Sequence, residues 1–154
     1  MTVVTNYKIF CVASGEIKTS ATEEKELQVS DSRNSLVAKL SSQPLFAGFS
    51  NDQLNELLED RRCLVKNFHH GQVVHLEGEP CPAVEIILSG EFAIERISED
   101  GTLMLVARLG PGDILGGNLV FSSIQNFPMT ITSRQYSSFV SLRRDLLLEL
   151  MHNS

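Results

Sequence analysis

The sequence predicts a mainly β domain, either a sandwich or a barrel, with a short helix at each end. From Cys63 onward, short apolar or alternating runs are interrupted by closely spaced glycine turns. Asp-Gly and Pro-Gly pairs mark several of these turns, which is typical of antiparallel strands. Helical patterns occur before and after this region. With 154 residues, the chain has room for one ordinary domain with a core of its own.

The first predicted helix begins after Ser50, which forms a capping-box pattern with Gln53 three residues later. Three leucines between residues 54 and 58 then fall on one face of the helix, and polar residues fall on the other. This pattern predicts a short amphipathic helix that ends near Arg62.

The predicted strands follow in sequence order. In residues 92–97, Ala93, Glu95 and Ile97 alternate with the other three, as in a strand with one face in water. Asp100-Gly101 lies between two of the runs and is the strongest hairpin signal in the chain. The runs expected to form strands are CLVKNF, VVHL, VEIILSGEFAIERI, TLMLVARL and MTITSRQYSSFVSL.

The two ends of the chain differ in character. Residues 145–151 are apolar and helix-prone, with Asp145 in the first turn, which predicts a C-terminal helix. Residues 1–34 are expected to be a mobile leader, because most of this polar segment cannot bury enough apolar surface to offset its ordering entropy. Residues 1–12 are β-prone, so an added strand is the alternative there. The folded domain is therefore expected to span residues 35–154.

Composition excludes several functional classes. Thirteen Lys and Arg against nineteen Asp and Glu give a net charge of −6, which disfavours binding to nucleic-acid phosphates. There is no apolar run long enough to span a bilayer and no secretory signal pattern, so a cytoplasmic protein without a membrane partner is expected. Cys11, Cys63 and Cys81 are widely spaced, so they are interpreted as reduced thiols and not as a disulfide framework or a zinc site.

Four stretches between about Leu40 and Asn153 carry a family resemblance: PLFAGFSNDQLNELL, HHGQVVHLEGEPCPAVEIILSGEFAIER, EDGTLMLVARLGPGDILGG and YSSFVSLRRDLLLELM. In order and glycine spacing they resemble the cyclic-nucleotide-binding-like sensor domain of the Crp/Fnr superfamily of bacterial transcription regulators. The resemblance implies a double-stranded antiparallel β-roll, similar to a jelly roll, with short flanking helices. It covers the sensor domain only, without the helix-turn-helix domain of full-length members.

The resemblance also places an effector pocket around the glycine-rich turn. In nucleotide-binding members, a Glu in this turn accepts a hydrogen bond from the ribose 2′-hydroxyl, and a later Arg-Ser pair holds the cyclic phosphate. The corresponding positions here are Gly117, Phe127 and Pro128. Burying a phosphate without its cation is costly, so cyclic AMP binding is not expected. The degenerate pocket is expected to comprise Gly116, Gly117, Asn118, Leu119, Phe127, Pro128 and Met129.

The pocket is also expected to be apolar. Phe121, Phe127, Met129 and Ile131 would line it, which suits an apolar or mixed metabolite. The alternative is that these side chains simply fill the interior of the roll and leave no ligand site.

Three groups of polar residues are interpreted as structural. The histidines are assigned to a turn and a strand, with metal or haem ligation as the alternative. The acids are assigned to a solvated face and the arginine pairs to helix boundaries. No catalytic motif occurs, so neither an enzyme nor a cofactor is predicted. The residues are His69, His70 and His75; Glu77, Glu79, Glu91 and Glu95; and Arg61-Arg62 and Arg143-Arg144.

The predicted function is a non-catalytic sensor domain of a Crp/Fnr-type regulator, with a small-molecule effector of unidentified class. Direct DNA binding by this chain is not expected. The macromolecular partner that could be expected is a second copy of the chain, in a weak dimer, or another protein. Two alternatives stay open. One is a ligand-free protein-interaction module of the same fold, and the other is a fragment of a cyclic-nucleotide receptor.

Overall fold

The computed structural model describes residues 32–152. The chain divides into two compact units, Met1–Lys39 and Leu40–Ser154. A helix covers residues 32–41, and the predicted boundary between the leader and the domain falls within it. The strand considered for residues 1–12 and the thiol of Cys11 lie outside the described residues.

Short helices open the second unit. A 3₁₀ helix, η1, spans Pro44–Phe46, and α3 spans Asn51–Glu59. The predicted capping box is confirmed, because the Ser50 hydroxyl accepts a hydrogen bond from the Gln53 N–H and the Gln53 amide oxygen accepts one from the Ser50 N–H. The helix ends before the predicted Arg62, since Asp60 is extended and its carboxylate accepts a hydrogen bond from the Arg62 N–H at 2.8 Å.

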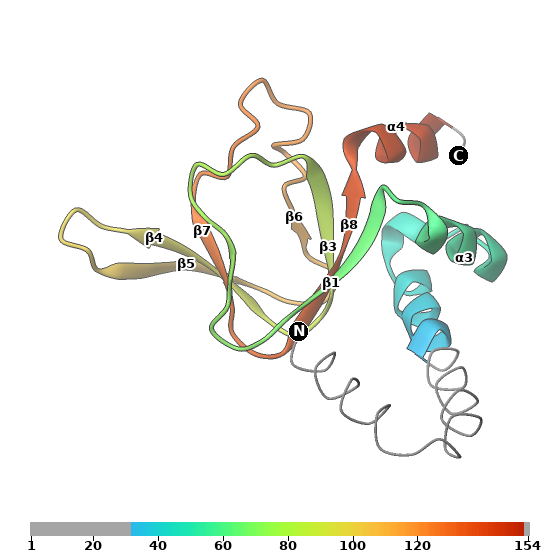
Figure 1. Ribbon diagram of the computed structural model, residues 1–154, viewed down its shortest axis with the longest axis horizontal. Helices are drawn as coiled ribbons and strands as arrows, with labels where there is room; N and C mark the ends of the chain where they lie inside the picture. Colours follow the sequence, from blue (N-terminus) through green and yellow to red (C-terminus); the bar gives the residue numbers. More distant parts are fainter. Residues whose placement is uncertain (1–31, 153–154) are drawn as a thin grey trace, which may run out of the picture. The chain divides into compact units, whose positions relative to one another are not determined.

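Within the described residues, eight strands form two four-stranded antiparallel sheets (Figure 1). This arrangement confirms the mainly β class and the double-sheeted roll. The first sheet has the order β1-β8-β3-β6, with β1 at Cys63–Phe68, β8 at Ser137–Arg143, β3 at Ala83–Ser89 and β6 at Ile114–Leu115. The second has the order β2-β7-β4-β5, with β2 at Val73–His75, β7 at Thr130–Ser133, β4 at Phe92–Ile97 and β5 at Leu103–Leu109.

Aromatic rings from both sheets form the centre of the roll. Phe92 on β4 and Phe139 on β8 are fully buried, and the Phe68 ring on β1 lies 5.0 Å from that of Phe139. The central strands β3 and β8 are buried along almost their whole length, which explains their continuous runs of apolar and small residues. This packing unites the two sheets around one core.

The β4–β5 hairpin confirms the signal at Asp100-Gly101. The predicted alternation along β4 is wrong, however, because Phe92 and Ala93 are both fully buried and Glu95 is only 7% exposed. Both faces of β4 are covered near its start, and the register shift opposite Ile94 and Glu95 comes from one extra residue, Val106, on β5. Glu95 is therefore not a solvated acid, and its counter-charge is the guanidinium of Arg134 at 3.6 Å.

The last helix, α4, spans Arg144–His152 and confirms the predicted C-terminal helix. Arg62 fastens it to the start of β1, since its two terminal nitrogens each donate a hydrogen bond of 2.8 Å to the carboxylate of Glu149. The prediction that Arg62 lies at a helix boundary is confirmed, and the sequence did not reveal its pairing with Glu149. The Arg144 guanidinium lies 5.8 Å from the centre of the Phe121 ring. No helix in the described part of the chain is long and apolar enough to cross a membrane.

Candidate effector site

Gly116, directly after β6, occupies a backbone conformation that favours glycine. Its φ is +76°, and a Cβ at this position would lie 2.6 Å from the Cys81 sulfur and 3.0 Å from the Ala83 carbonyl oxygen. Its own carbonyl accepts hydrogen bonds from the N–H groups of Leu119 and Val120. The fold itself thus requires this glycine, whether or not a ligand binds.

Gly117 is under no such constraint. Its φ lies outside the left-handed region, and a Cβ there would only approach Ile114, with 3.4 Å to the Cγ2 atom. Asn118 is exposed and Leu119 is half-buried, whereas Val120 is 1% exposed. A Cβ at position 117 is therefore sterically acceptable. Backbone strain does not explain why this position has glycine and not a residue with a carboxylate.

Backbone hydrogen bonds join the segment before β7, residues 125–127, to the turn that follows β2, residues 78–81. The Phe127 carbonyl accepts a hydrogen bond from the Gly78 N–H at 2.8 Å, and the Phe127 N–H donates to the Glu79 carbonyl at 2.9 Å. The Cys81 N–H donates to the Gln125 carbonyl. Because Cys81 also lies against Gly116, both halves of the predicted pocket meet along residues 78–83.

His75 on β2 is held between two carboxylates. Its Nδ1 lies 2.9 Å from Oε2 of Glu79, and its Nε2 lies 2.7 Å from Oε2 of Glu85 on β3. The imidazole is stacked on the Phe127 ring, with 4.1 Å between centroids and 14° between planes. The Glu85 side chain is only 5% exposed, so this contact places a paired charge inside the roll.

The carboxylates stabilise the charged form of the imidazole. Burial by itself lowers the pKa of His75, but the hydrogen bonds and charges of Glu85 and then Glu79 outweigh it, and the pKa is raised above its ordinary 6.5. With both carboxylates ionised and the imidazole protonated, the cluster carries one positive and two negative charges. This cluster of two carboxyl groups and one imidazole lies directly beside Phe127.

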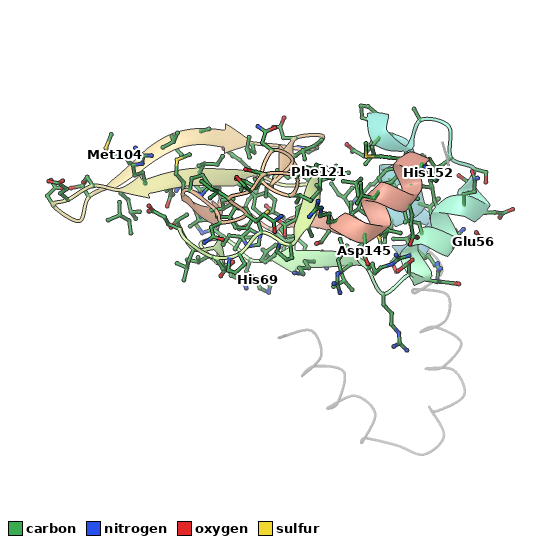
Figure 2. All side chains as sticks on the ribbon, turned by 90° about the horizontal axis from the view of Figure 1, so that it is seen from above. Glu56, His69, Met104, Phe121, Asp145 and His152 are labelled. Atoms are coloured by element: carbon green, nitrogen blue, oxygen red, sulfur yellow. The ribbon has the colours of Figure 1, made fainter. Side chains whose placement is uncertain are left out.

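The structure brings together some of the predicted pocket residues and not others. Phe127 and Ile131 are 3% and 4% exposed and belong to the interior, and Met129 is half-buried, whereas Pro128 is exposed. The prediction for Phe121 is wrong, because this ring is 47% exposed and faces Arg144 at the surface. Figure 2 shows Phe121 beside the start of α4.

Sequence reasoning missed the pairing of His75 with Glu85. A signal was present, since Glu85 is a lone acid inside the apolar run VEIILS. A buried acid of this kind needs a partner. The assignment of His75 to a strand is confirmed, and the ring of His69 lies 5.6 Å from that of Tyr136.

The two thiols in residues 32–152 are not activated. Cys63 and Cys81 are both free and buried. Burial raises the pKa of Cys63 to about 12, and burial together with the nearby Glu85 raises the pKa of Cys81. Among the described residues, no group of three or more His, Cys, Asp or Glu side chains is arranged to hold a metal ion.

Eight antiparallel strands in two sheets, with a glycine turn after β6, define a β-roll domain. The chain belongs to the cyclic nucleotide-binding domain family, whose family model matches residues 65–154.

Solved structures with the same fold come from bacterial transcriptional regulators. A transcriptional regulator from Thermotoga maritima is 27% identical, with a TM-score of 0.59, over 66% of this chain and 77% of that one. The sensor domain of the transcriptional regulator DNR from Pseudomonas aeruginosa is 22% identical, with a TM-score of 0.65, over 79% of each chain. Catabolite activator protein from Thermus thermophilus is 20% identical, with a TM-score of 0.57, over 72% of this chain and 51% of that one. None of the curated proteins matches the chain.

Proposed function

We propose that this chain is the non-catalytic sensor domain of a Crp/Fnr-type transcription regulator whose nucleotide site does not accept cyclic AMP. The observation that carries the proposal is the stacking of Phe127 on His75. Phe127 occupies the position at which the family resemblance expects the phosphate-binding arginine. A buried aromatic ring therefore replaces the cation.

The electrostatics of the surroundings support the same proposal. Glu79 and Glu85 flank the imidazole that contacts Phe127, so two carboxyl groups lie where a bound phosphate would need a cation. An uncompensated phosphate in a partly buried site costs about 3–5 kcal/mol, and the missing carboxylate at position 117 removes a charge-assisted hydrogen bond worth about 1.5–3 kcal/mol. Together these terms amount to several powers of ten in affinity.

The effector of such a domain is a small molecule that does not rely on a phosphate contact. Phe127 and Ile131 are buried and Met129 is half-buried at this end of the roll, which favours an apolar or mixed metabolite. A second candidate function, a protein-interaction module of the same fold, is favoured by the exposed apolar side chains of the β4–β5 hairpin.

Calorimetric titration of the full chain with cyclic AMP and cyclic GMP tests the proposal directly. We expect no binding at concentrations below about millimolar, a Kd range that corresponds to about −4 kcal/mol. Micromolar binding of either nucleotide would overturn the assignment of positions 117, 127 and 128.

A gain-of-function pair sharpens the test. The double variant Gly117→Glu with Phe127→Arg introduces both the carboxylate and the guanidinium that the family resemblance expects. The backbone at position 117 tolerates the new side chain. The variant is expected to be less stable alone, because Phe127 is buried, but to be stabilised by added cyclic AMP. The matched control, Gly117→Glu with Phe127→Gln, supplies the carboxylate without the cation and should show little stabilisation.

Thermal-shift screening against a metabolite library separates the two candidate functions. A sensor domain should gain melting temperature with at least one small molecule, since any ligand of the native state stabilises it. An interaction module should gain none. For either function, the net charge of −6 predicts no sequence-specific DNA binding by this chain at physiological salt.

A further inference from the structure

A groove lies between helices α3 and α4, outside both sheets. Its volume is about 610 Å³, which falls within the range of small-molecule binding sites. Both figures place the two helices next to each other, and Figure 2 labels Glu56 on α3 and Asp145 at the start of α4. The apolar and acidic side chains that line this α3–α4 groove are Phe49, Leu57, Leu146, Leu150, Glu56 and Asp60.

The floor and walls of the groove are apolar. Leu57 on α3 and Leu146 on α4 are 5% and 4% exposed, and the half-buried Leu150 follows Leu146 by one helical turn. Phe49, also half-buried, packs against the buried ring of Phe46, with 5.6 Å between centroids and 86° between planes. The groove therefore presents a fixed apolar surface to an organic group.

One guanidinium holds both helices that form the groove. Arg62 donates a hydrogen bond of 2.9 Å to Asp60, directly after α3, and two of 2.8 Å to Glu149 on α4. These contacts fix the end of α3 against α4, so the groove is already formed without a ligand. They also pair the charge of the Asp60 carboxylate.

The unpaired charge at the groove is negative. Glu56 is exposed and forms no ion pair with any residue in the described part of the chain. Neither Lys nor Arg occurs among the described residues that line the groove. An anionic ligand would therefore meet only carboxylates, whereas a cation gains an opposite charge. The Phe49 ring adds a second favourable contact for a cation, through the face of its π system.

We propose that the α3–α4 groove binds a small organic ammonium compound, whose apolar part contacts Leu57, Leu146 and Phe49 and whose ammonium group pairs with Glu56. A short groove with one unpaired carboxylate matches a single small compound better than the several turns of a docking helix. The proposal is independent of the effector of the roll, because these residues lie outside the eight strands.

An NMR titration of the full chain with octylamine, which is protonated at neutral pH, tests this site. Octanol and octanoate are the comparison compounds, since they keep the apolar chain and change only the charge. We expect octylamine to bind with a Kd near or below about 1 mM and about tenfold more tightly than octanoate. The amide shifts should concentrate in residues 48–60 and 144–152, and added salt should reduce the difference between the two compounds.

A charge-removing variant identifies the carboxylate. Glu56→Gln should weaken octylamine binding about three- to fivefold and leave octanol binding unchanged. Asp52→Asn is the matched control, because Asp52 is also an exposed acid on α3 but does not line the groove, and it should leave the affinity for octylamine unchanged. Thermal denaturation checks that both variants remain folded.

Several results would contradict the proposal. If octanoate binds as tightly as octylamine, or if Glu56→Gln has no effect, the groove does not select a cation. Shifts centred on residues 125–131 would place the compound in the roll instead. If octylamine causes no shift at millimolar concentration, the groove is not a site for small ammonium compounds, and a helix of another protein becomes the occupant to test.

Discussion

The imidazole of His75 lies flat against the ring of Phe127, with 4.1 Å between their centroids. The contact joins β2 to the segment that leads into β7, and backbone hydrogen bonds between residues 78–81 and 125–127 reinforce it. Since Glu79 and Glu85 hold the two ring nitrogens, the imidazole that stacks on Phe127 is itself fixed by two carboxylates.

Stability is expected to fall as the pH rises above 6.5, the ordinary pKa of a histidine. The pKa of His75 is raised in the folded state, so the cluster contributes fully below the ordinary pKa of 6.5 and loses its contribution as the pH passes through the higher folded value. Urea unfolding at a series of pH values, with an NMR titration of the His75 ring, measures both quantities. In Glu85→Gln the His75 pKa should drop and the pH dependence should flatten. A wild-type stability that is constant from neutral to alkaline pH would contradict this account.

Gly90→Ala should be far more destabilising than Gly101→Ala. Both glycines have a positive φ, +85° and +83°, so both substitutions carry a similar backbone strain. A Cβ at position 90 would lie 2.6 Å from the Cα of Ser137, whereas a Cβ at position 101 meets nothing within 4 Å. The difference between the two free energies of unfolding should be about 1–3 kcal/mol, from steric overlap alone. Equal losses in chemical denaturation would show that the backbone at Ser137 moves aside easily.

Arg62→Ala should loosen α4. Arg62 donates hydrogen bonds to Glu149 and Asp60 and holds the pKa of both carboxyl groups below its usual range. We expect a melting temperature lowered by a few degrees and faster hydrogen exchange in residues 144–152. Arg61→Ala is the control, because its side chain is exposed, and it should leave both observables unchanged. Identical behaviour of the two variants would mean that the contact with Glu149 contributes nothing measurable.

Thr132→Val should raise stability, whereas Thr130→Val should lower it. The Thr132 hydroxyl is buried and has no hydrogen-bond partner in the described part of the chain. The Thr130 hydroxyl, two residues earlier on β7, accepts a hydrogen bond from the Glu77 N–H at 3.2 Å. Removing an unpaired buried hydroxyl should add about 1 kcal/mol to the free energy of unfolding, and removing a paired one should cost about as much. Thermal denaturation of the two isosteric variants measures this difference. A loss of stability in both variants would contradict the expected gain in Thr132→Val.

Local signals determined most of the secondary structure from the sequence alone. The capping box at Ser50 and Gln53 is made within one helical turn, and the hairpin at Asp100-Gly101 depends on a backbone conformation that glycine supplies. The glycine spacing of the roll also predicted the family, and the structure shows that Gly116 and Gly90 each lie too close to neighbouring atoms to carry a Cβ. The sequence also places Gly117 and Phe127 where the family resemblance expects Glu and Arg, and this assignment stays a prediction.

Only the tertiary structure decided which polar residues are buried and what they contact. Glu85 and His75 are ten positions apart on strands of different sheets, and Arg62 meets Glu149 across 87 positions, so no local pattern links them. The burial of Glu95 and the surface position of Phe121 likewise depend on neighbouring strands and on α4. The physical reason is the same in each case, because side-chain burial and electrostatic pairing depend on distance in space, which the chain acquires only when its two sheets pack together.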